Sequence, residues 1–288
     1  MTAQPTTVAP GTAPAPLGGT PLTPAFRARR WLERNGLRIF AGLAFTYLFT
    51  PIAYVTVFSF NVPGRSNLTW RGFSLANWQN PCGAPEVCQA VGNSLKIGLV
   101  STLLATVLGT MVAFALSRHR FRGRATTNLL IFLPMATAEV VLAASLLALF
   151  LNLGVPLGTL TIVLAHVMFC ISFVVVAVKA RIASLDPRLE QAAADLYATE
   201  TQAFVRVTLP LVAPGIAGAA LLAFSLSFDD YIITNFVSGD VTTFPKFVYV
   251  SAQRGIPGQA YVVGAAMFFL TLLVVAAGET LRRRRKTG

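Results

Sequence analysis

The segment LGTLTIVLAHVMFCISFVVVAV, residues 157–178, decides the fold. It contains no Lys, Arg, Asp or Glu. An α-helix needs roughly 20 predominantly apolar residues to cross about 30 Å of hydrocarbon, and helices in soluble cores are usually shorter. We therefore predict that this segment is a transmembrane helix.

The rest of the chain contains five further apolar runs of similar length. They cover residues 37–60, 93–117, 126–151, 211–237 and 260–281. Of all 288 residues, 55% are hydrophobic and only 12% are charged, which excludes an ordinary soluble domain. The sequence predicts an all-α integral membrane protein with six transmembrane helices.

The net charge of +12 comes from Lys and Arg clusters that lie beside the apolar runs. These clusters lack the interleaved aromatic residues of a nucleic-acid groove, so we expect no nucleic acid partner. They fall at 27–38, 118–124, 179–206 and 282–286. Under the positive-inside rule, this pattern places both termini in the cytoplasm. The predicted outer loops carry only four basic residues, Arg65, Arg71, Lys246 and Arg254.

Composition also divides the chain into regions. Residues 1–26 are rich in Pro, Thr, Ala and Gly, which is typical of a disordered tail, and they lack the basic start of a signal peptide. Residues 27–281 form the predicted membrane domain, and 282–288 form a basic cytoplasmic tail. The connection at 61–90 has the composition of an ordered polar loop, and 239–257 is a second outer loop.

Three acidic residues lie within or near apolar runs: Glu139, Asp229 and Asp230. A carboxylate at the centre of a membrane helix costs about 3 kcal/mol, so such groups normally face a water-filled path or a partner charge. We predict a cavity with negative walls, in which aromatic side chains add cation–π contacts. The candidate aromatic residues are Phe228, Tyr231 and Phe236. A helix cap or a salt bridge to a companion subunit would also account for Asp229 and Asp230.

Histidine and cysteine residues give no metal-binding pattern. His166 lies in an apolar run beside small residues, which favours interhelical hydrogen bonding over a proton relay. Cys82 and Cys88 are a candidate disulfide pair on the oxidising side, and we expect Cys170 to be a buried thiol. No CxxC spacing is present, so no metal site is predicted.

The basic connection 179–209 is Ala-rich with acidic and amide residues, so we expect it to be helical. It contains LEQAAADLYA at 189–198 and FVRVTLP at 204–210. Small alanines leave a shallow surface that another protein can approach closely, and Pro210 is expected to separate this helix from the next run. The alternative is a helix on the lipid surface, but Glu190, Asp195 and Glu200 disfavour anionic headgroups.

This segment resembles the EAA loop of ABC importer permeases, whose short helix sits in a groove of the ATPase subunit. The resemblance implies that ten residues couple the chain to an ATPase: Glu190, Gln191, Ala192, Ala193, Asp195, Leu196, Tyr197, Ala198, Leu209 and Pro210. Two positions depart from the family pattern, because Gln191 stands at its usual glutamate and Tyr197 at its usual glycine.

Other segments are similar to the spermidine/putrescine branch of that family. They include AHVMFCISF at 165–173, FSLSFDDYIIT at 224–234, TFP at 243–245 and RGIP at 254–257, so the similarity covers nearly all of 37–281. It implies the type I ABC importer permease fold, a multi-pass location in a bacterial cytoplasmic membrane, and polyamine import. Polyamines carry separated ammonium groups, which separated carboxylates can pair.

The resemblance further implies partners: a second homologous permease in a heterodimer, two ATPase subunits, an extracytoplasmic substrate-binding protein, and membrane lipid. ATP and Mg²⁺ would be used by the ATPase, and no cofactor is expected in this chain. The sequence contains no GxxxxGK[ST], nucleophile elbow or HExxH motif, so we expect a transport subunit and not an enzyme.

Three alternatives remain open at this point. The same architecture could carry another small solute, such as an aminophosphonate, a thiamine-like molecule or iron. A proton-coupled secondary carrier would use Glu139, Asp229 and His166 as relay groups. A membrane anchor that only scaffolds an enzyme complex would leave the acidic residues without a role.

Overall fold

The computed structural model describes residues 24–64, 69–119, 121–186 and 188–287, with only the backbone described at 24–34, 274, 279 and 281–287. The predicted disordered tail therefore lies almost wholly outside the described residues. The chain divides into two units, 1–54 and 55–288. The first contains most of helix α1 (Pro24–Phe58), and the second contains all the following elements.

The described residues form helices and connecting turns, with one isolated bridge between Asn61 and Phe73. After α1 the elements are α2 (Ala76–Gln79), α3 (Pro85–Arg118), α4 (Arg124–Ala136), α5 (Glu139–Asn152), α6 (Thr159–Ala183), α7 (Arg188–Asp195), α8 (Glu200–Ala203), the π-helical η1 (Phe204–Thr208), α9 (Leu209–Asp229), α10 (Ile232–Val237), α11 (Phe244–Arg254) and α12 (Gly258–Thr287). The all-α prediction is confirmed. The predicted basic tail continues the backbone of α12, and its side chains lie outside the described residues.

Five helical segments are long and apolar enough to cross a membrane, and the α4–α5 pair makes a sixth if it counts as one broken span. The five cover 35–58, 85–118, 159–183, 200–229 and 258–278. Each predicted apolar run therefore contains helix. The predicted sides of the two termini remain a prediction from charge.

The third run, predicted as one helix over 126–151, is instead broken. Helices α4 and α5 meet at 107° across Thr137 and Ala138, which both have extended backbone. Pro134 lacks the N–H group that would continue the helical hydrogen bonds, and α4 ends two residues later. The Thr137 hydroxyl donates to the Leu133 carbonyl at 2.7 Å, which satisfies one acceptor at the end of α4. The break places Glu139 at the start of α5.

Two other boundaries also differ from the prediction. The fifth run does not continue unbroken to 237, because α9 ends at Asp229 and α10 follows after a short break. The predicted outer loop 239–257 contains the helix α11, which begins with Pro245 in its first turn.

In the other predicted outer loop, 61–90, the Asn61 side chain accepts the Arg71 N–H at 2.8 Å, and the Asn77 side chain donates to the Asn61 carbonyl at 2.9 Å. The described residues of this loop, 61–64 and 69–90, are ordered, as predicted.

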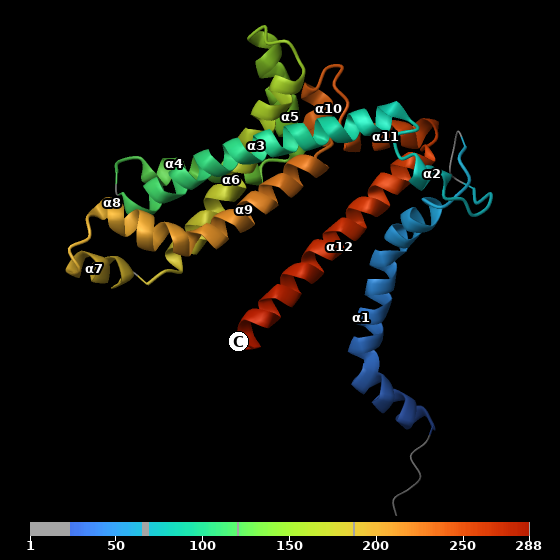
Figure 1. The fold of residues 1–288 in the computed structure, drawn as a ribbon, viewed down its shortest axis with the longest axis horizontal. Helices are drawn as coiled ribbons and strands as arrows, with labels where there is room; N and C mark the ends of the chain where they lie inside the picture. Colours follow the sequence, from blue (N-terminus) through green and yellow to red (C-terminus); the bar gives the residue numbers. More distant parts are fainter. Residues whose placement is uncertain (1–23, 65–68, 120, 187, 288) are drawn as a thin grey trace, which may run out of the picture. The chain divides into compact units, whose positions relative to one another are not determined.

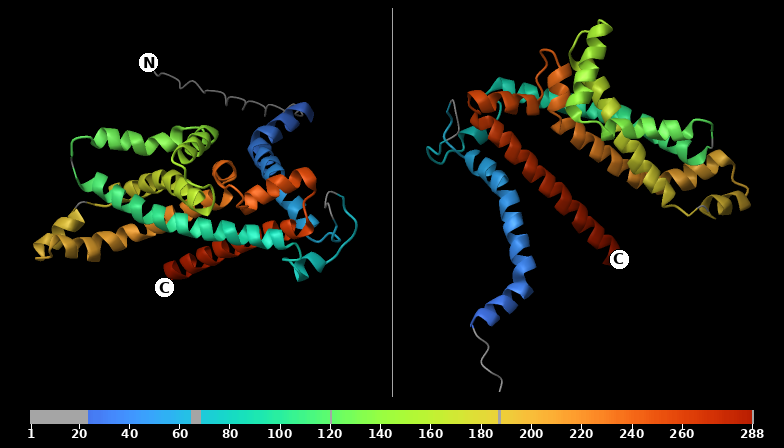
Figure 2. Two further views of the ribbon diagram at one scale, coloured as in Figure 1. Left: turned by 90° about the horizontal axis from the view of Figure 1, so that it is seen from above. Right: turned by 180° about the vertical axis from the view of Figure 1, so that it is seen from behind.

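Helices α3, α6 and α9 pack side by side and hold the buried core (Figure 1). The grouping is also seen from above and from behind (Figure 2). Helices α7 and α8 lie at one end of the group, and α10 and α11 lie toward the other end (Figure 1). Side chains of α3 that face away from this core, such as Leu103 and Met111, are each 65% exposed, as expected for contact with lipid.

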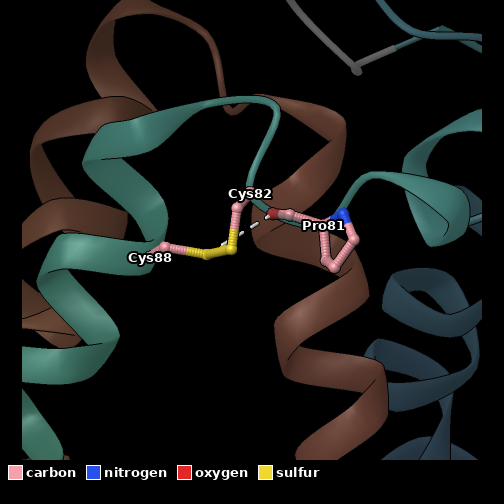
Figure 3. The surroundings of a disulfide bond; sticks show 3 residues. All are labelled: Pro81, Cys82 and Cys88. Carbon is pink, nitrogen blue, oxygen red and sulfur yellow. Dashed lines mark hydrogen bonds between the residues drawn. A yellow bond between two sulfur atoms is a disulfide. The ribbon is translucent and has the colours of Figure 1, made fainter.

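A disulfide between Cys82 and Cys88 lies at the N-terminal end of α3 (Figure 3). Cys88 lies in the first turns of α3, and its Sγ is 3.9 Å from the Pro81 carbonyl oxygen. The bond ties the preceding loop to the start of the helix.

Gly109 of α3 packs tightly against α6, which generates a prediction. A Cβ at Gly109 would lie 2.7 Å from Val174 Cγ1 of α6, whereas a Cβ at Gly92 of the same helix meets nothing within 4 Å. We expect Gly109→Ala to lower the free energy of unfolding by about 1–3 kcal/mol through overpacking. Thermal unfolding in detergent measures this. Gly92→Ala is the matched control and should be neutral or slightly stabilising; equal stability of the two variants would contradict the predicted close packing.

Candidate functional site

The break between α9 and α10 is stabilised by one buried carboxylate. Asp230 has an extended backbone, with φ −66° and ψ 124°, so the helix stops there. Its carboxylate accepts the Thr234 N–H at 2.7 Å, the Thr234 hydroxyl at 2.8 Å and the Ile233 N–H at 3.3 Å. Asp230 therefore satisfies the first N–H groups of α10 and holds the break in place.

His166 of α6 joins this break to the core. It is only 1% exposed, and its Nδ1 lies 2.7 Å from the Ser227 Oγ on α9. Its Nε2 lies 3.0 Å from the Thr234 Oγ1 and 3.2 Å from the Asp230 Oδ2. The prediction of interhelical hydrogen bonding for His166 is confirmed. Cys170, one turn further along α6, is a buried free thiol, as predicted.

The three acidic residues singled out from the sequence line one depression of about 380 Å³. Glu139 and Asp229 are exposed there, whereas Asp230 is buried. The remaining lining residues are Phe169, Ser225, Leu226, Tyr231 and Ile232. The bend between α4 and α5 brings Glu139 to this place from a distant part of the sequence. Two carboxylates are thus free to bind a cation, while Asp230 is committed to the hydrogen bonds of the break.

A second depression, of about 620 Å³, adjoins the first through two shared residues, Asp229 and Tyr231. Its walls are mostly aromatic and apolar: Phe228, Phe244, Pro245, Val248, Tyr249, Ala252 and Met267. The rings of Tyr231 and Tyr249 stack with centroids 4.3 Å apart. Aromatic faces beside a carboxylate suit an alkylammonium group. Phe236, the other predicted aromatic residue, lines neither depression.

Sequence reasoning missed Phe244 and Tyr249 because residues 239–257 were predicted to be a loop. The available signal was Pro245 followed by apolar residues at helical spacing, Phe247 and Val248 among them. Among the described residues, no group of three His, Cys, Asp or Glu side chains could hold a metal ion.

The connection predicted to bind an ATPase is helical, as expected, and it projects two large side chains. Leu196 is 82% exposed and Tyr197 is 97% exposed, just after α7. Tyr197 has a φ of +59°, the left-handed conformation that favours glycine. Gln191, Ala192, Asp195 and Pro210 are also exposed, Ala198 and Leu209 are half-buried, and Ala193 is buried.

Pro210 does not end the coupling helix, contrary to expectation. Helix α8, η1 and α9 run on as one helical segment over 200–229, and Pro210 lies in the first turn of α9. In η1 the Leu209 N–H donates to the Phe204 carbonyl, a wider turn than in an α-helix. Such a turn accommodates the missing N–H of proline without breaking the segment. The turn at Tyr197, and not Pro210, keeps α7 short.

Glu190 points toward the protein and not outward. Its carboxylate forms an ion pair with Arg118 at the end of α3 and accepts the Thr208 hydroxyl at 2.6 Å. The side chain is 48% exposed. Glu190 is thus a partly exposed residue whose carboxylate is bound to side chains of α3 and η1.

Residues 105–287 match the family model described as binding-protein-dependent transport system inner membrane component. The chain is 33% identical over 256 residues to the spermidine/putrescine transport system permease protein PotC of Haemophilus influenzae, covering 88% of this chain and 98% of the relative. It is 38% identical over 222 residues to the putrescine transport system permease protein PotI of Escherichia coli K12, covering 74% of this chain and 79% of the relative.

Solved structures share the fold at low sequence identity. A chain of a bacterial ABC transporter that imports the acidic polysaccharide alginate matches with a TM-score of 0.64 and 15% identity, over 91% of this chain and all of that one (100%). A chain of the MetNI methionine ABC transporter matches with a TM-score of 0.58 and 17% identity, over 70% of this chain and 98% of that one.

The two neighbouring aspartates give a sharp prediction about the break. Asp230→Ala removes the buried acceptor of the Ile233 and Thr234 N–H groups and of the Thr234 hydroxyl, and we expect a loss of about 1–3 kcal/mol in the free energy of unfolding. Asp229→Ala, at the exposed neighbour, should change it by less than about 0.5 kcal/mol. Thermal unfolding of both variants in detergent checks this, and a larger loss for Asp229→Ala would contradict the assignment.

Proposed function

The chain belongs to the family of binding-protein-dependent transport system inner membrane components and is a multi-pass protein of the cytoplasmic membrane, and we propose that it imports polyamines as one permease of an ATP-driven complex. The observation that carries this proposal is the depression shared by Glu139, Asp229 and Asp230. The transport systems after which the PotC and PotI relatives are named support the same class of substrate.

A polyamine matches the chemistry of the two adjoining depressions. One ammonium group would pair with Glu139 or Asp229, because charge-assisted hydrogen bonds are the stronger ones. The methylene chain would lie on the stacked rings of Tyr231 and Tyr249. The phosphonate group of an aminophosphonate would be repelled by the two exposed carboxylates, so this class of solute is disfavoured.

The energy would come from a separate ATPase that binds the α7 region. Leu196 and Tyr197 form an exposed apolar tip on a segment whose flanking basic residues predict a cytoplasmic position. Two adjacent large side chains exposed to water are suited to binding a protein partner. ATP-driven movement of this tip would rock the permease pair between inward and outward openings, with a binding protein delivering the substrate outside.

Neutral variants of the free acids test the substrate path. The permease pair is reconstituted with its ATPase and binding protein, and entry of labelled putrescine and spermidine is followed with and without ATP. We expect Asp229→Asn and Glu139→Gln each to reduce uptake roughly tenfold, because a charge-assisted hydrogen bond contributes about 1.5 kcal/mol or more.

The control is Asp240→Asn, which removes an exposed acid outside both depressions. Wild-type uptake in both site variants would remove the proposed path. Uptake that survives without ATP but collapses with a protonophore would replace the ATP-driven proposal with a secondary carrier.

Cysteine cross-linking tests the ATPase contact separately. Leu196→Cys and Tyr197→Cys should each cross-link to the ATPase in membranes, because both positions are exposed at the tip. Ala193→Cys in the same segment should not, because Ala193 is only 9% exposed. The proposal fails if neither tip position captures the ATPase, or if Ala193→Cys captures it as readily.

A further inference from the structure

A cluster of three polar side chains joins three segments that are far apart in the sequence. Arg118 is the last residue of α3, Glu190 lies in the first turn of α7, and Thr208 is the last residue of η1. Glu190 Oε1 accepts both from Arg118 Nη2 and from the Thr208 hydroxyl, and Arg118 Nη2 also lies 3.4 Å from Thr208 Oγ1. One carboxylate oxygen therefore connects α3, α7 and η1.

Two aromatic rings hold the Arg118 side chain in this position. Its guanidinium carbon lies 5.0 Å from the ring centroid of Phe204 and 5.9 Å from that of Phe114. The two rings meet edge to face, with centroids 5.0 Å apart. Cation–π contacts of this kind orient an arginine as well as attract it. Phe204 begins η1, so the cluster contacts both ends of that segment.

The order of the helices along the chain shows how this cluster could transmit a movement of α7. Helix α7 is joined through the backbone to α6 on one side, and to α8, η1 and α9 on the other. A movement of α7 reaches those helices through covalent bonds. It reaches α3, the remaining member of the central group, only through side chains.

We propose that Glu190 and Arg118 form a latch that makes α3 move with α7, so that Glu190 acts as a positioning residue within the permease and is not a contact to the ATPase. The inference rests on the proposed ATP-driven function and assigns a different role to a residue that the EAA resemblance placed at the ATPase. The contact to the ATPase is then assigned to other exposed residues of this connection, above all Leu196 and Tyr197 just after α7.

The first test measures the latch without any ATPase. Hydrogen exchange of the α7 amides is followed in the permease in lipid nanodiscs, for the wild type, Glu190→Ala and Arg118→Ala. We expect exchange at 188–195 to rise about three- to fivefold in each variant, the range for loss of a partly exposed ion pair. The pair is partly exposed, at 33% for Arg118 and 48% for Glu190. Unchanged exchange in both variants overturns the latch, whatever the energy source proves to be.

The second test measures coupling in the reconstituted complex, as molecules of putrescine imported per ATP hydrolysed. Glu190→Ala and Arg118→Ala should lower this ratio to a similar extent, and the double variant should lower it no further. Exchanging the charges, with Glu190→Arg and Arg118→Glu together, should restore part of it. When Tyr197→Cys is combined with each of these variants, its cross-linking to the ATPase should equal that of Tyr197→Cys alone.

Glu200→Gln is the matched control, because it removes an acidic charge from the same connection and Glu200 pairs with no cation among the described residues. Its ratio should equal that of the wild type. If Glu190→Ala alone abolishes capture of the ATPase while Arg118→Ala is silent, Glu190 belongs to the ATPase contact and the latch is wrong. If Leu196→Cys and Tyr197→Cys capture no ATPase in an otherwise wild-type permease, the proposed function fails, while the exchange measurement still judges the latch.

Discussion

Hydrocarbon offers no hydrogen bonds, so any break in a membrane helix has to satisfy its own backbone groups within the protein. The break after α9 meets this constraint through Asp230, whose carboxylate accepts two backbone N–H groups, and through His166, which bonds to Asp230, Ser227 and Thr234. Because that network fixes the chain direction after α9, it also fixes where Asp229 and Tyr231 lie. Both depressions depend on those two residues.

Much of the architecture could be predicted from the sequence, because long apolar runs have few solutions in a bilayer. The helical connection before α9 and the hydrogen bonding of His166 were likewise predictable from composition and burial. The bend at Thr137 and Ala138 was not, because neither residue is a strong turn former and the apolar run continues across it. The grouping of Glu139 with Asp229 depends on that bend, so the acids could be proposed singly but not placed together.

Glu190 shows a different limit. In the sequence it is one of several polar residues beside Gln191 and Asp195, and a helix so short gives no sign of which side faces inward. Its direction is set by Arg118, which is 72 residues away in the sequence. Tyr197 is a related case: the positive φ is retained where the family usually has glycine, at a local cost of about 1–2 kcal/mol that the surrounding turn has to offset. The spacing of the family pattern could identify the turn at Tyr197, but it could not show that Tyr197 adopts a positive φ there.

The disulfide at the start of α3 allows an inference about the side of the membrane on which that helix begins. Such bonds persist in oxidising compartments and are rare in the cytosol. Redox chemistry predicts an extracytoplasmic position for Cys82 and Cys88, and the distribution of basic residues independently predicts a cytoplasmic position for Arg118. The two ends of α3 therefore carry separate chemical indications of the predicted topology: a disulfide at its start and a basic residue, Arg118, at its end.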